Sequence, residues 1–127
     1  MTRGSGRIAW LSYAPAVVWA AFLLWLGGLT FDGPFEPDSP IPWDKFAHLG
    51  LYGMLGALAV LGWRWAGRRP HILVPLGVAL AVGVVDELNQ RSVALRSADP
   101  LDFLADLIAI VLAFVILRRV REPEGAR

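Results

Sequence analysis

Four long apolar segments divide the chain, and the polar residues collect between them. The segments cover about residues 8–29, 45–63, 71–89 and 100–118. A helix needs about 20 mostly apolar residues to cross the ~30 Å hydrocarbon core of a bilayer. Each segment comes close to that length. We therefore predict an all-α integral membrane four-helix bundle in which every segment is one span.

Arginines and carboxylates separate between alternate connections of this bundle. Nine of the eleven arginines precede the first span, join the second to the third, or follow the fourth: Arg3, Arg7, Arg64, Arg68, Arg69, Arg118, Arg119, Arg121 and Arg127. The connection at residues 30–44 instead carries Asp32, Glu36, Asp38 and Asp44. Short loops rich in Lys and Arg stay on the cytoplasmic side. The pattern predicts a multi-pass plasma-membrane protein with both termini in the cytoplasm.

Composition narrows the function classes. The chain has 127 residues, is 56% hydrophobic and contains no cysteine, and its mean hydropathy is +0.52. These values predict one membrane domain and exclude disulfide and thiolate chemistry. Nucleic acid is not an expected partner, because the arginines flank spans, where they meet anionic lipid headgroups. The first segment lacks a signal-peptide cleavage pattern, so we expect it to be a retained helix.

Polar residues recur at helical spacing near the outer ends of three spans. The three stripes are Lys45, His48 and Tyr52; Gly83, Glu87 and Gln90; and Asp99, Asp102, Asp106, Ala109 and Ala113. Residues three, four and seven apart share a helix face. A charged residue inside a span normally turns toward protein, water or a partner. We therefore expect the stripes to converge on a polar pocket at the extracytoplasmic ends of the second, third and fourth helices.

Several single residues have expected structural roles. Lys45 is the only lysine beside eleven arginines, which indicates that a compact ammonium is needed there. Asp44 and Asp99 precede helices and are candidate caps. Trp19 is too central to be an interfacial anchor and is expected to pack against a neighbouring helix. Glycines and Ala57 on the second span offer surfaces for close helix approach.

At these residues the chain resembles the VanZ-like family of small bacterial membrane proteins, named after a protein associated with teicoplanin resistance. The resemblance covers about residues 40–117. It rests on DKFAHLGLY (44–52), DELNQ (86–90), Arg96 and DPLDFLADLIA (99–109). Asp106 stands where the family usually has Asn, and Ala109 where it usually has Gly. The resemblance implies a role in the bacterial cell envelope without defining a reaction, and the added Asp106 charge bears on any transfer of ligand preference.

Two classes of function fit this constellation. In the first, the pocket binds or processes a lipid-linked or glycopeptide-like molecule. Its expected catalytic residues are His48, Glu87 and Lys45, and its expected ligand-binding residues are Tyr52, Gln90, Arg96, Asp102 and Asp106. In the second, a non-catalytic resistance or interaction protein uses the loop at residues 31–43, and the stripes form a structural network. The predicted pocket has more acidic than basic residues, which is compatible with a divalent metal but does not require one. Whether the protein is an enzyme and whether it oligomerises stay open.

Overall fold

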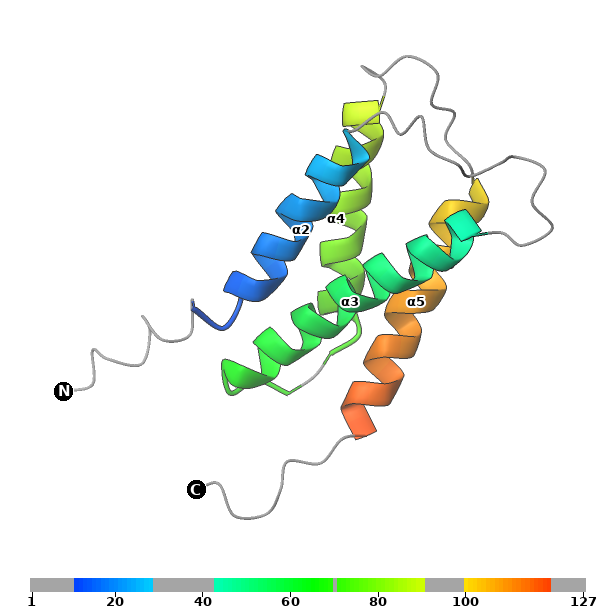
Figure 1. Cartoon of the computed structure of the whole chain (residues 1–127). Coiled ribbons are helices and arrows are strands. Elements are labelled where there is room, and N and C mark those ends of the chain that lie inside the picture. Colours follow the sequence, from blue (N-terminus) through cyan, green and yellow to red (C-terminus); the bar gives the residue numbers. More distant parts are fainter. Residues whose placement is uncertain (1–10, 29–42, 70, 91–99, 120–127) are drawn as a thin grey trace.

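The computed structural model describes residues 11–28, 43–69, 71–90 and 100–119. Its four helices are α2 (Ala14–Gly27), α3 (Trp43–Trp65), α4 (Leu73–Gln90) and α5 (Pro100–Arg119). The prediction of an all-α chain of four helices is confirmed for this part of the protein. The helices alternate in direction, so that α3 and α5 run parallel to each other and opposite to α2 and α4 (Figure 1).

A turn interrupts the first of the predicted helices. Ser12 and Tyr13 form a turn, and α2 begins at Ala14, with Pro15 in its first turn. Proline has no N–H group, and its ring clashes with the carbonyl group four residues earlier. It is therefore favoured at a helix start and breaks the continuous helix that we predicted over residues 8–29.

The other helix boundaries lie close to the predicted ones. α5 begins at Pro100 as expected. α4 begins at Leu73 rather than residue 71. α3 begins at Trp43, so Asp44 belongs to its first turn instead of the capping position.

Helix α3 is the centre of the bundle, because it packs against the other three helices and most extensively against α5. Two glycines of α3 permit this approach. A Cβ atom on Gly56 would lie 3.2 Å from the Cα atom of Ile110, and one on Gly53 would lie 3.7 Å from the Cβ atom of Ala109. Gly50 has open space where a Cβ would be. The predicted small-residue contact is thus made by Gly53 and Gly56.

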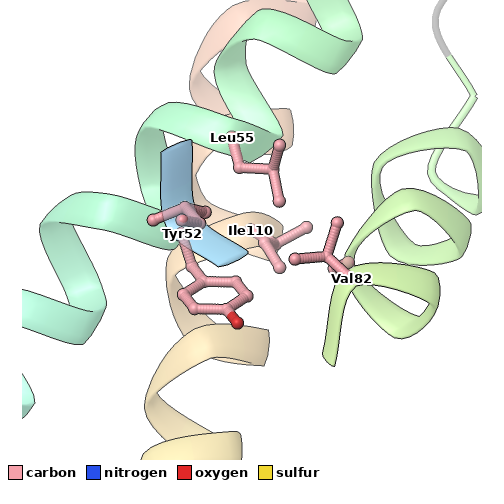
Figure 2. Close-up of a cluster of buried hydrophobic side chains, with 6 residues drawn as sticks. Tyr52, Leu55, Val82 and Ile110 are labelled. Atoms are coloured by element: carbon pink, nitrogen blue, oxygen red, sulfur yellow. The ribbon is translucent and has the colours of Figure 1, made fainter. Parts of the chain in front are cut away.

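The core lies where α2, α3, α4 and α5 meet. Figure 2 shows Tyr52 and Leu55 of α3 beside Val82 of α4 and Ile110 of α5. Trp19 of α2 packs against this cluster, and its indole Nε1–H donates to the backbone oxygen of Leu51 at 2.9 Å. The prediction that Trp19 packs against a neighbouring helix is confirmed.

The outward faces of the helices are apolar. The exposed fractions of Val18, Leu80 and Ile116 are 69%, 56% and 62%, one residue from each of α2, α4 and α5. Two helical stretches, Lys45–Trp65 and Pro100–Arg119, are long and apolar enough to cross a membrane. The apolar stretches of α2 and α4 are shorter, at Ala14–Gly27 and Leu73–Asp86. Among the described residues, therefore, only two of the four predicted spans form helices that are long and apolar enough to cross a membrane.

Candidate functional site

An ion pair joins the beginnings of α3 and α5. Lys45 Nζ donates to Asp102 Oδ1, and the two side chains are 23% and 27% exposed. Because both helices run in the same direction, their first turns lie side by side. A lysine near the start of one therefore faces an aspartate near the start of the other. The sequence placed both residues on polar stripes, and the structure brings them into contact.

One turn further along, His48 lies between two carboxylates of α5. Its Nδ1 atom is 2.9 Å from Asp106 Oδ1, and its Nε2 atom is 3.7 Å from Asp102 Oδ2. The two aspartates are four residues apart and share a helix face. When Nδ1 carries the proton of a neutral imidazole, it donates to Asp106, and the Nε2 lone pair is left as an acceptor. The His48 side chain is 31% exposed, whereas that of Asp106 is 12% exposed.

Tyr52 closes the inner side of this group. Its ring stacks on the His48 imidazole, with a centroid separation of 6.1 Å and an interplanar angle of 8°. Tyr52 itself is only 6% exposed and belongs to the apolar core shown in Figure 2. We call Lys45, His48, Tyr52, Asp102 and Asp106 the polar cluster. It lies near the beginnings of α3 and α5, and Tyr52 joins it to the apolar core.

Helix α4 faces the bundle with residues that the predicted stripe missed. Asp86 packs on α2, where a Cβ on Gly27 would lie 2.2 Å from Asp86 Oδ1. Asn89 Nδ2 donates to the Leu24 backbone oxygen at 3.5 Å. Asp86 is also near enough to Tyr52 and Asp106 for its charge to act on both. Asp86 therefore belongs to the electrostatic surroundings of the polar cluster, although we had not predicted it as a site residue.

A signal for Asp86 was present in the sequence. The inward face of α4 carries Ala79 and Val82, which are buried, and continues to Asp86 and Asn89 at spacings of three and four residues. The predicted stripe of Gly83, Glu87 and Gln90 begins one residue later. Gly83 has open space at its Cβ position. The apolar register of the helix would have selected Asp86 over its neighbours.

Several predicted site residues lie outside the part that the structure describes. Arg96 and Asp99 belong to the segment before α5. Glu87, Gln90 and Asp44 have a described backbone, at the end of α4 and the start of α3, but their side chains are outside the description. The predicted roles of Glu87, Gln90 and Arg96 as acid or base or as ligand contacts, and of Asp99 as a cap, stay predictions.

The described residues of the site carry a net negative charge. The ammonium of Lys45 pairs with Asp102; Asp86 and Asp106 add two further carboxyl groups, and His48 adds a positive charge only when protonated. Within the described ranges no group of three or more His, Cys, Asp or Glu side chains could hold a metal ion. The arrangement can exchange protons at His48 and can form hydrogen bonds to a ligand that carries hydroxyl or amine groups.

The chain matches no family model, no curated protein and no solved structure. Its fold and site are therefore interpreted from their own geometry.

Proposed function

We propose that this chain is a VanZ-like protein of the bacterial plasma membrane, with four spans, both termini in the cytoplasm and the polar cluster near the outer face. The described outer surfaces of the helices support this, because they are apolar and water would not solvate them well. In the most apolar stretches of α3 and α5, only 33% and 28% of the helix is buried inside the protein. A core helix of a soluble protein would be mostly buried. The short α2 and α4 are compatible with a locally thinned bilayer.

The polar cluster, in this proposal, binds or processes a lipid-linked or glycopeptide-like molecule of the cell envelope. The observation that carries it is the geometry of His48. Asp106 holds one side of the imidazole from a buried position, while the other nitrogen lies on the more exposed side near Asp102. A carboxylate that orients a histidine in this way fixes its tautomer and makes the second nitrogen a general base. The Tyr52 ring lies nearly parallel to the imidazole.

The charge of the site bears on the kind of ligand. A bare phosphate or carboxylate would be repelled by the three aspartates, whereas sugar hydroxyls or an amine would find acceptors. Lys45 is proposed to exchange part of its contact with Asp102 for an electronegative atom of the ligand. Arg96, Glu87 and Gln90 are proposed as further contacts from the neighbouring segments. This assignment favours the glycan or amino part of an envelope molecule over its phosphate.

A pair of histidine substitutions tests this proposal. On this proposal, expression of the wild-type protein raises the teicoplanin resistance of the host cells, and His48→Ala should remove that increase while the amount of folded protein in the membrane stays the same. His71→Ala is the matched control, because His71 is exposed at the opposite end, where its ring Nδ1 accepts a hydrogen bond from the Leu73 backbone N–H. Resistance that survives His48→Ala, in membranes that contain the wild-type amount of protein, would reject a working role for the cluster.

A second candidate function has its own support. The pairs Lys45–Asp102 and His48–Asp106 both link α3 to α5, as a network that fixes helix register would. The protein would then be a non-catalytic resistance or interaction protein, and residues 31–43 would be its working surface. Replacing residues 31–43 with a Gly/Ser linker should abolish resistance in this case. His48→Ala would instead lower the amount of folded protein.

A further inference from the structure

The opposite end of the bundle carries a second concentration of charge. We call Arg64, Arg68, Arg69, Arg118 and Arg119 the arginine end. The described carboxylates all lie at the other end of the helices, at the start of α3 and α5 or the end of α4. Arg64 Nη1 donates to the Leu117 backbone oxygen at 3.0 Å. This contact brings the last turn of α3 next to the last turn of α5, so their arginines share one surface.

The turn after α3 is built to hold its arginines in place. Gly67 has a φ of 74°, its N–H donates to Arg64 O at 2.8 Å, and the Arg68 N–H donates to Trp63 O at 3.2 Å. These two bonds and the left-handed glycine form a Schellman motif. The Trp63 indole Nε1–H then donates to Arg69 O at 3.0 Å. Three hydrogen bonds within one turn thus hold the backbone from Gly67 to Arg69.

The side chain of Arg68 is ordered as well. Its guanidinium lies over the Trp63 ring, 4.6 Å from the centroid, and on α5 the Arg118 guanidinium lies 6.0 Å from the Phe114 centroid. A guanidinium that stacks on an aromatic face keeps its N–H groups directed outward in its plane, where they can bind phosphate oxygens bidentately. Arg68, Arg69, Arg118 and Arg119 are all exposed.

We infer that the arginine end binds the headgroup phosphate of an anionic phospholipid, such as phosphatidylglycerol, in the cytoplasmic leaflet. Charge complementarity identifies the headgroup. Apolar side chains beside it identify a lipid, because Trp65 and Ile116 are 60% and 62% exposed near the ends of α3 and α5, where acyl chains would run. The inference needs the membrane location proposed above. It is independent of any ligand at the polar cluster, which lies at the other end of the same helices.

The test compares short-chain lipids titrated onto the purified protein in neutral detergent, with binding read by native mass spectrometry. Phosphatidylglycerol should bind in preference to phosphatidylcholine. Arg68→Gln/Arg69→Gln should weaken phosphatidylglycerol binding about fivefold for each arginine removed. Arg121→Gln/Arg127→Gln is the matched control, since it removes two charges beyond α5, and it should change the affinity less than threefold. An equal loss of phosphatidylglycerol affinity in both double variants would show that the lipid is attracted by overall positive charge, and it would contradict a specific site at the arginine end.

Two further measurements complete the test. The first distinguishes a lipid headgroup from free phosphate as the ligand, and the second distinguishes this inference from the proposed function of the polar cluster. Inorganic phosphate at the same concentration should not displace the lipid. If it does, the site recognises phosphate alone, and the lipid assignment is wrong. His48→Ala should bind phosphatidylglycerol like the wild type, because it alters only the polar cluster. A loss of lipid binding in His48→Ala would show that the two ends are not separate sites and would overturn the inference as stated.

Discussion

At the scale of single residues, His48 and Asp106 form the contact on which the proposed function depends most. We predict that the pair couples by about 0.5–2 kcal/mol in a double-mutant cycle built from His48→Ala, Asp106→Ala and the double variant. The physical reason is that Asp106 is 9% exposed and its oxygen lies 2.9 Å from His48 Nδ1. Either single change therefore leaves a partly buried polar group without this partner. The measurement is the free energy of unfolding in mixed micelles.

The control for this cycle pairs Asp106→Ala with His71→Ala. These residues lie at opposite ends of the helices, so their effects should add within about 0.5 kcal/mol. Additive effects of His48→Ala and Asp106→Ala would contradict the contact. The variant Asp106→Asn is informative beside them, because the asparagine side chain keeps an oxygen acceptor at the same position. It should destabilise the protein less than Asp106→Ala.

Gly67 gives a second prediction at this scale. Gly67→Ala should destabilise the protein by about 1–2 kcal/mol, since an L-residue is strained at its φ of 74°. Gly77 is the matched control. It lies inside α4 and has open space at its Cβ position, so Gly77→Ala should stabilise the helix by up to about 1 kcal/mol. Thermal unfolding of both variants checks the opposite signs, and equal signs would contradict the left-handed conformation at Gly67.

The residue pairs of α3 and α5 could be predicted from the sequence, but Asp86 could not by the same reasoning. Lys45, His48, Asp102 and Asp106 are isolated polar residues on helices that are apolar elsewhere, so helical spacing alone puts each set on one face. Near the end of α4 the polar residues are consecutive. Spacing cannot then select a face, and only the buried apolar positions earlier in the helix reveal which residue points inward.

At the scale of elements, apolar length predicted the helices well and their ends less well. Pro100 begins α5 as predicted, because a first-turn proline loses no hydrogen bond. Pro15 acts in the same way in α2, yet we had predicted a helix that runs through it. The apolar residues before Pro15 predicted a longer helix, although the proline ring disfavours a helix that continues through it. Hydropathy reports where a segment can be buried, whereas backbone geometry decides where the helix begins.

Gly56 tests the packing of α3 on α5. Gly56→Leu should destabilise the protein by about 1–3 kcal/mol, because a Cβ there would already lie 3.2 Å from the Ile110 Cα atom and the helices would have to separate. Gly50→Leu on the same helix is the matched control. Its Cβ would meet nothing within 4 Å, and leucine is a better helix former than glycine. A Gly56→Leu variant as stable as Gly50→Leu would contradict the close approach.

At the scale of the whole molecule, the antiparallel alternation of the helices turns a sequence pattern into two chemically different ends. The beginnings of α3 and α5 gather Lys45, His48 and the aspartates, whereas their last turns carry Arg64, Arg118 and Arg119. Helix direction in Figure 1 is enough to produce this separation. It also explains why the two proposals concern separate sites: the length of the apolar core lies between them.

The separation of charge leads to a prediction about orientation, which the absence of native cysteine makes direct to test. Single cysteines at Asp38 and Arg69 would each be the only thiol in the protein. In intact cells a membrane-impermeant maleimide should label Asp38→Cys and leave Arg69→Cys unlabelled until the membrane is opened. The reason is that arginine-rich connections are retained in the cytoplasm, and in the proposed topology the chain crosses the bilayer once between these two positions. Labelling of Arg69→Cys in intact cells would place the arginine end outside and would remove the cytoplasmic-leaflet lipid as its ligand. It would also turn the polar cluster toward the cytoplasm, away from any envelope molecule on the outer face.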